Sequence, residues 1–179
     1  MLYATAMSAS LPDDADPGPP PPRKPVSVLR FDLGSHPFAL LLADVQELLR
    51  AVAVTPLADA PASVLGVIDL RGDLVPVYDL RPRLGLPTAP VRTTDVFVVV
   101  GLMRRLVVLK VDRVEGIEEV APAGVEALGL RFTPSALVAG VVPLVDGTRV
   151  LYDLDGFLTE LEQTQLETAL ASSLAPDLA

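Results

Sequence analysis

Short apolar runs separated by glycine and proline turns follow one another along most of the chain. Residues 28–42 hold an alternating run, a turn and a second apolar run, and residues 96–111 repeat this plan with a turn expected at Gly101. Two such runs on either side of a turn are typical of a β-hairpin. The pattern therefore predicts a mainly β fold from about residue 26 onward.

Residues 66–80 and 140–154 share one design. Each stretch begins with Gly-Val, ends with Tyr-Asp-Leu at the same offset, and holds a glycine turn between two apolar runs. Both stretches therefore predict a further β-hairpin. Acidic-apolar segments at 44–48 and 112–116 follow the earlier hairpins at similar offsets. We expect two copies of one small β-unit.

The remaining segments are less regular. Residues 44–52 are compatible with a helix or a strand, because short apolar runs do not separate the two. Residues 118–138 contain two prolines and two glycines and are expected to be irregular. Thr159 begins a capping box with Glu162, and leucines further on can form one apolar stripe, so a helix is predicted over about 159–172.

The first 25 residues differ from the rest, with 7 prolines and little that a core could bury. This composition favours a disordered arm. A proline-rich ligand for a partner domain is the alternative.

Composition narrows the function classes. Half of the residues are hydrophobic but only 4% are aromatic and none is Trp, so the core must be aliphatic. The net charge of −9 argues against nucleic-acid binding and against direct contact with an anionic membrane. The chain has no cysteine, no secretory signal pattern and no apolar run of membrane-spanning length. These features fit a cytoplasmic protein.

The sequence offers little catalytic chemistry. His36 is the one histidine, and no cysteine accompanies it to build a zinc site. Asp69 and Asp73 could form an acid/base or metal-binding pair, but ordinary turn chemistry is the favoured interpretation. Asp79 and Asp153 hold matching places in the two repeats and suit a structural capping role. We therefore expect no catalytic, cofactor-binding or metal-binding residues and no small-molecule substrate.

Arg71 stands out because it lies at a predicted hairpin tip in a chain with few basic residues. A guanidinium can make several directed hydrogen bonds to carboxylates or carbonyls of a partner. A local ion pair with Asp69 or Asp73 is the alternative, and the residues alone leave both open.

At these residues the chain resembles the CheW family, the coupling proteins of bacterial chemotaxis. The family's mark is an Asn-Leu-Arg-Gly turn, and residues 66–80 match its surroundings. Residues 31–34 are similar to its Phe-x-Leu-Gly opening and residues 45–47 to its Val-Gln-Glu segment. The resemblance covers roughly residues 27–162. Asp69 replaces the usual Asn, which removes an amide donor and adds a charge beside the arginine.

The resemblance implies two pseudo-symmetric five-stranded SH3-like β-barrels that share an apolar core. The CheW-like domain is expected over residues 26–172. The first barrel would span about 26–90, the second about 91–158 and the C-terminal helix about 159–172.

The resemblance also implies a non-enzymatic scaffold that bridges the cytoplasmic tips of methyl-accepting chemoreceptors to the histidine kinase CheA. Such a protein acts in receptor arrays and meets the membrane only through the receptors. The receptor's helical hairpin would lie in a groove between the barrels. Val45 and Glu47 would line the groove, Gly66 would allow close approach, and Arg71 would bond the receptor tip. The regulatory domain of CheA would pack end-to-end against the barrel termini.

One alternative stays open, and two others are disfavoured. A CheW-like adaptor could serve another chemosensory-type pathway, such as surface motility or gene regulation. The regulatory region of a CheA kinase would be expected to follow a long catalytic region. A CheV-like adaptor would need about a hundred further residues for a receiver domain.

Overall fold

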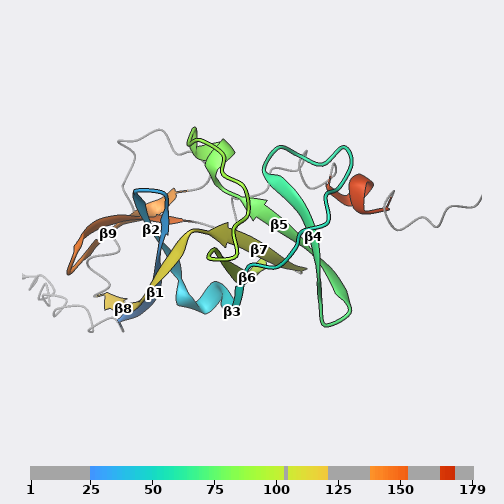
Figure 1. Ribbon diagram of the computed structural model, residues 1–179. Helices are drawn as coiled ribbons and strands as arrows, with labels where there is room; N and C mark the ends of the chain where they lie inside the picture. The colour runs from blue at the N-terminus through green and yellow to red at the C-terminus, as the bar shows by residue number, and fades with distance from the viewer. Residues whose placement is uncertain (1–24, 103–104, 121–137, 153–165, 172–179) are drawn as a thin grey trace, which may run out of the picture.

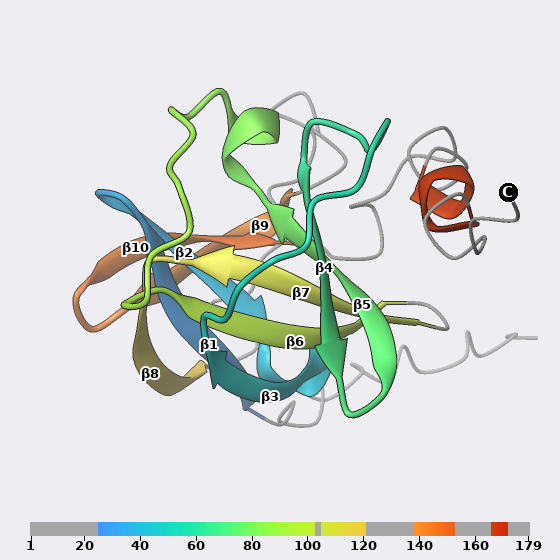
Figure 2. The ribbon, with the colours of Figure 1, turned by 45° about the vertical axis from the view of Figure 1, so that its right-hand side comes forward.

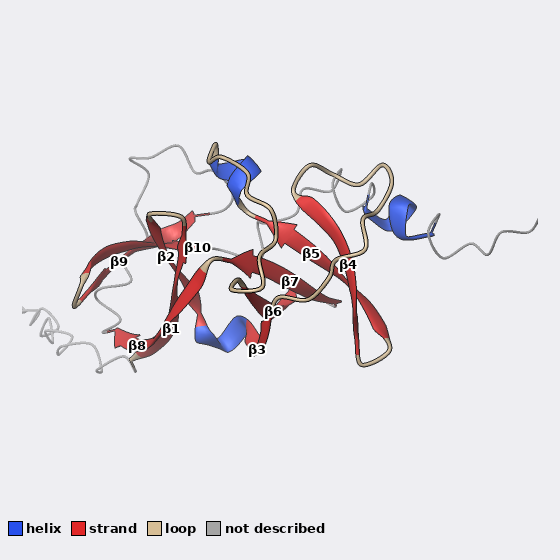
Figure 3. Ribbon diagram, in the orientation of Figure 1, coloured by secondary structure: helices blue, strands red, loops and turns tan. Residues whose placement is uncertain are grey.

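The computed structural model describes residues 25–102, 105–120, 138–152 and 166–171 (Figure 1). The described part is dominated by strands, with two short 3-10 helices and a helix over 166–171 (Figure 3). In chain order the elements are β1 (Val26–Leu33), β2 (His36–Leu41), η1 (Leu42–Asp44), β3 (Val45–Arg50), β4 (Val64–Leu70), β5 (Asp73–Asp79), η2 (Arg81–Leu84), β6 (Val96–Leu102), β7 (Arg105–Val111), β8 (Arg113–Val120), β9 (Val138–Leu144) and β10 (Gly147–Tyr152).

The strands form two five-stranded sheets (Figure 2). The first, here called the terminal sheet, has the order β8-β1-β2-β10-β9, and the second, the central sheet, has the order β3-β6-β7-β5-β4. In each sheet two antiparallel hairpins meet at a parallel pair, β2 with β10 and β5 with β7. The predicted mainly β fold with two five-stranded units and internal pseudo-symmetry is therefore confirmed.

The expected boundary near residue 90 does not separate the two units. The terminal sheet combines β1 and β2 with three strands from the second half of the chain, and the central sheet combines β3–β5 with β6 and β7. The cause lies in two short connections: η1 leads from β2 into the central sheet, and a single residue, Asp112, leads from β7 into the terminal sheet. The two repeats therefore exchange strands.

Strands at the centre of the central sheet are buried on both faces. Val98 and Val100 of β6 belong to the largest apolar cluster, and Phe97 and Val99 belong to a second cluster on the opposite face. A continuous run of β-branched residues suits such a strand, because both sets of alternating side chains leave water. This burial explains the uninterrupted valines of the sequence.

The largest apolar cluster joins the two sheets. It contains Leu29, Phe31 and Phe38 from the terminal sheet together with Leu109 of β7 and Leu166 of the helix over 166–171. The Phe38 ring lies 5.9 Å from Phe31 and 5.0 Å from Tyr152 between ring centroids. The shared apolar core expected from the resemblance is therefore present.

The predictions for individual elements were confirmed in part. The four predicted hairpins form, and the ambiguous stretch 44–52 contains strand β3. Gly101 lies within β6 rather than in a turn, because the strand continues to Leu102. The arm over 1–24, most of the irregular stretch 118–138 and the first part of the predicted helix lie outside the described residues.

Candidate functional site

The β4–β5 hairpin turns at Arg71 and Gly72, whose φ angles are +59° and +95°. Positive φ at both central residues is the requirement of a type I′ turn, the form that matches the twist of a hairpin. The N–H of Gly72 donates to Asp69 Oδ1 at 2.7 Å. This contact needs only an acceptor, which Asp supplies as well as Asn. The departure from the family's Asn therefore leaves this contact of the turn intact.

Arg71 contacts a carboxylate far away in the sequence. Its Nη2 lies 2.7 Å from Glu47 Oε2 on β3, and the side chains are 76% and 25% exposed. The sequence left open a local ion pair of Arg71 with Asp69 or Asp73. In the structure Arg71 pairs with Glu47 instead. An exposed ion pair contributes about 0–1 kcal/mol. The guanidinium is thus oriented by Glu47 while most of it remains accessible.

Val45 and Glu47 lie two residues apart on β3, and both are half-buried. Val45 packs against the shared core. The ladder between β3 and β6 is irregular between Val45 and Glu47. Val45 opposes Val100 of the shared core, whereas Glu47 opposes Val99 on the other face. The structure therefore brings Glu47 and Arg71 together and turns Val45 toward the shared core.

Gly66 is buried instead of facing a partner. It has a φ of +144°, and a Cβ atom there would lie 2.1 Å from the backbone oxygen of Thr55. Thr55 and Val67 exchange two backbone hydrogen bonds of 2.9 and 2.8 Å across this contact. The close approach that Gly66 permits is therefore made by the chain's own backbone.

The second repeat does not reproduce the exposed arginine. Val145 and Asp146 form the β9–β10 turn, and Val145 is 90% exposed there. Arg149 is buried and pairs with Asp32, Glu115 and Asp146. Within the described residues, the candidate site is therefore confined to the first repeat.

The structure also contains a buried charge cluster that sequence reasoning missed. We call it the Asp79 cluster; its members are Asp79, Arg81, Asp95, Lys110 and Asp112. Lys110 Nζ is fully buried, donates to the backbone oxygen of Ala89 at 2.7 Å, and lies 3.8 and 3.7 Å from the carboxylates of Asp79 and Asp95. The one sequence feature that could have indicated this cluster is the lysine inside the apolar run of β7.

Asp79 also performs the structural role predicted for it. Its Oδ1 accepts the backbone N–H of Arg81, the first residue of η2, at 3.0 Å. The matching Asp153 lies outside the described residues.

Two opposing effects act on Asp112. Burial alone would raise the pKa of its carboxyl, but the N–H of Gly34 and the guanidinium of Arg81 stabilise the charged form and hold the pKa below its ordinary value. The unfolded chain therefore binds this proton more readily than the folded chain.

Acid should therefore weaken the fold partly through Asp112. Its contribution is present above the ordinary aspartate pKa of about 4 and is lost as pH falls through the lower folded value. In urea unfolding at a series of pH values, the free energy of unfolding of Asp112→Asn is expected to fall less steeply with acidification than that of the wild type. Parallel curves would contradict this role.

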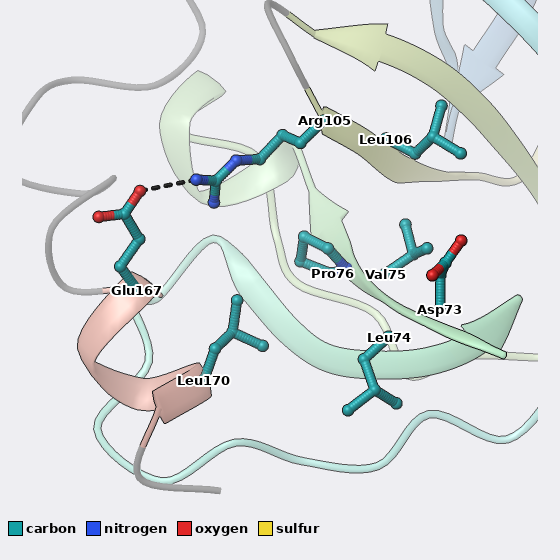
Figure 4. Close-up of a pocket in the computed structure, with 8 residues that line it drawn as sticks. All are labelled: Asp73, Leu74, Val75, Pro76, Arg105, Leu106, Glu167 and Leu170. Carbon is teal, nitrogen blue, oxygen red and sulfur yellow. Dashed lines mark hydrogen bonds and ion pairs between the residues drawn. The ribbon is translucent and has the colours of Figure 1, made fainter. Parts of the chain in front are cut away.

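A pocket of about 610 Å³ lies elsewhere on the central sheet (Figure 4). Leu74, Pro76 and Leu106 from the first parts of β5 and β7 line it, and Leu170 of the helix over 166–171 faces them. The ion pair between Arg105 and Glu167, at 2.6 Å, lies at its rim.

Two classes of feature are absent from the described residues. No group of three or more His, Cys, Asp or Glu side chains there could hold a metal ion. No helix in this part of the chain has the length and hydropathy that a bilayer span requires.

Comparison with known proteins decides the family. The model of the CheW-like domain matches residues 27–162. This chain belongs to the CheW-like family. The family predicted from the hairpin motif is therefore confirmed.

Curated relatives of this CheW-like chain carry chemotaxis names. The chemotaxis protein CheW of Rhizobium meliloti (strain 1021) is 34% identical over 99 residues, or 55% of this chain. The chemotaxis protein CheW of Klebsiella aerogenes is 27% identical over 149 residues, which cover 80% of this chain and 88% of that protein. The chain spans 64% and 58% of the lengths of its Rhizobium meliloti and Rhizobium etli relatives.

A solved structure has the same fold as this CheW-like chain. The crystal structure of the scaffolding protein TtCheW from Thermoanaerobacter tengcongensis matches with a TM-score of 0.70 and 24% identity, over 76% of this chain and 95% of that one. The relatives named chemotaxis protein CheW agree with the predicted family.

Proposed function

We propose that this chain is a coupling scaffold that binds chemoreceptor signalling tips and the histidine kinase CheA in a cytoplasmic signalling array. Membership of the CheW-like family and the chemotaxis names of its relatives support the general role. The relatives do not identify the receptor or the pathway, so an adaptor of another chemosensory-type pathway remains the alternative outcome.

The observation that carries the proposal is the Arg71–Glu47 pair. Arg71 projects from a two-residue turn, and a carboxylate on a different strand pairs with it. A solvent-accessible guanidinium can form directed hydrogen bonds to carboxylates or to the exposed carbonyl oxygens at the end of a helical hairpin. Contact with a receptor tip would thus require little reordering of Arg71.

Glu47 supplies the neighbouring surface of the proposed receptor site, and Val45 anchors the start of β3 on the shared core. Gly66 contributes indirectly, because its contact with Thr55 holds the start of the hairpin against the segment that follows β3. The proposed site therefore consists of Arg71 and Glu47, with Val45 and Gly66 as supporting residues.

Arg71→Glu is expected to abolish binding to the receptor tip. The change reverses the charge offered to the partner, and a loss of about 3 kcal/mol, or roughly a hundredfold in affinity, is reasonable for a charged hydrogen bond at an interface. The thermal midpoint should shift by only a few degrees, because the pair is exposed and worth at most about 1 kcal/mol. Titration calorimetry with a receptor-tip fragment and with the CheA regulatory domain measures both affinities.

Two further variants make this test specific. Arg105→Glu applies the same charge change to an exposed ion pair between β7 and the helix over 166–171, and it is expected to retain receptor binding. The double variant Glu47→Arg with Arg71→Glu restores an ion pair but reverses its direction. If the partner recognises the guanidinium itself, the double variant stays inactive. Recovered binding would show that Arg71 only holds the turn, and normal binding by Arg71→Glu alone would refute the site.

A further inference from the structure

The chain passes directly between the two sheets at Asp112. β7 ends at Val111 in the central sheet and β8 begins at Arg113 in the terminal sheet, so one residue makes the crossing. The other short crossing, η1, uses three residues. Any change in the relative orientation of the sheets must therefore act on the backbone around Asp112.

Asp112 is bonded to both sheets at once. Its N–H donates to the backbone oxygen of Asp32 at 3.0 Å, and its carboxylate accepts the N–H of Gly34, so both contacts join it to the β1–β2 hairpin of the terminal sheet. The same carboxylate oxygen accepts Arg81 Nη2 at 2.5 Å. Arg81 belongs to η2, which directly follows β5 of the central sheet.

Arg81 is itself held rigidly within the central sheet. The residue is 3% exposed, and its Nη1 lies 3.1 Å from Asp79 Oδ1. Asp79 in turn lies near Lys110, which is anchored on the backbone oxygen of Ala89. The guanidinium thus has one edge on the central sheet and the other on Asp112.

The apolar core and the Arg81–Asp112 ion pair constrain the two sheets in different ways. Apolar burial holds the sheets together but is non-directional. The charge-assisted hydrogen bond joins a buried guanidinium to a carboxylate that is 27% exposed, and such a bond depends strongly on distance and angle. We infer that the Arg81–Asp112 pair is an orientation clamp that fixes the angle between the terminal and central sheets. This inference rests on the fold and does not depend on the proposed receptor site.

The clamp has a mechanical consequence. Partners that bind the two sheets separately would be held at a fixed mutual angle, and a load on one sheet would be passed to the other through Arg81 and Asp112. Loss of the clamp should leave both sheets folded but let their orientation vary.

A distance measurement between the sheets tests the clamp. Because the chain has no cysteine, Leu48→Cys on β3 and Ile117→Cys on β8 place one nitroxide label on each sheet at exposed strand positions. Pulsed electron paramagnetic resonance then gives the distribution of label distances. The full-length chain with the two labels is expected to show one narrow distribution, and adding Asp112→Asn is expected to abolish it in favour of a broad one.

Two more variants protect the test against a simple folding defect. Arg81→Lys keeps the buried positive charge, but a lysine cannot contact Asp79 and Asp112 with two separate edges, so it should broaden the distribution as well. Arg113→Gln removes an ion pair with Asp32 that lies wholly within the terminal sheet, and it should leave the distribution narrow. Circular dichroism reports the folding of each variant, and whichever clamp variant folds decides the outcome.

Narrow, unshifted distributions in the folded clamp variants would overturn the inference. Unfolding of both clamp variants would overturn it too, because the pair would then be needed to form the core instead of orienting two folded sheets.

Discussion

Replacing Gly66 with alanine is expected to lower the free energy of unfolding by about 4 kcal/mol. The new Cβ would lie 2.1 Å from the backbone oxygen of Thr55, so the two segments must separate. Separation removes two backbone hydrogen bonds with Val67, at about 1 kcal/mol each, and the φ of +144° adds about 1–3 kcal/mol of strain for a residue with a side chain. A loss of this size is a large fraction of a typical domain's stability.

Gly116→Ala supplies the matched control. Gly116 has a nearly identical φ of +140°, but among the described residues, its two chain neighbours aside, no atom lies within 4 Å of the position where its Cβ would be. It should therefore show the backbone strain alone, about 1–3 kcal/mol. Urea unfolding of both variants isolates the cost of the contact as the difference between them. Equal losses would mean that the segment around Thr55 moves aside freely.

Local chemistry made the hairpins predictable. Each depends on a turn signal and two adjacent apolar runs, and all of these lie within one short window of sequence. The expected turn at Gly101 was wrong because a glycine inside an apolar run does not by itself end a strand.

The exchange of strands between the repeats could not be predicted from local sequence patterns. Strands β3 and β8 each pair with a hairpin from the other half of the chain, and nothing in a local pattern states which edge a strand will join. The connections that decide it, η1 and Asp112, are too short to carry a recognisable motif. The internal repeat therefore predicted two units correctly but assigned their strands incorrectly.

In the candidate site, too, the local feature was predictable and the long-range contact was not. Arg71 was identified because an arginine at a glycine turn is a local feature, and the structure places it exposed at that turn. Its partner Glu47 is 24 residues away, so the pair itself could not be derived from turn chemistry. Gly66 was predicted to allow close approach of a receptor, and in the structure the group next to it is the backbone of Thr55.

The Asp79 cluster was missed for a related reason. Its members come from the ends of β5 and β7, from η2 and from the loop before β6, and each looks like an ordinary charged residue in its own window. Only the three-dimensional arrangement shows that five charges are brought together at the end of the central sheet. Lys110 is the member whose removal should be felt most strongly, because it is fully buried.

Lys110→Met is expected to lower the free energy of unfolding by about 3–5 kcal/mol, the usual cost of breaking a buried ion pair by removing one partner. Methionine fills a similar volume, so the loss is electrostatic and does not come from a cavity. Without Lys110, Asp79 keeps its ion pair with Arg81. Asp95 keeps the hydrogen bond from the backbone N–H of Arg92. The backbone oxygen of Ala89 also loses its donor. Urea unfolding at neutral pH measures the effect.

Two comparisons identify the cause of this loss. Arg105→Met removes a cation from an exposed pair and should cost less than about 1 kcal/mol, since water replaces the lost contact. Adding Asp95→Asn to Lys110→Met removes one of the carboxylates left without a cation, and the double variant should regain part of the lost stability. If Lys110→Met matches the wild type, water must reach the Asp79 cluster; if Asp95→Asn gives no recovery, the loss comes from the lysine's contact with Ala89 and not from uncompensated charge.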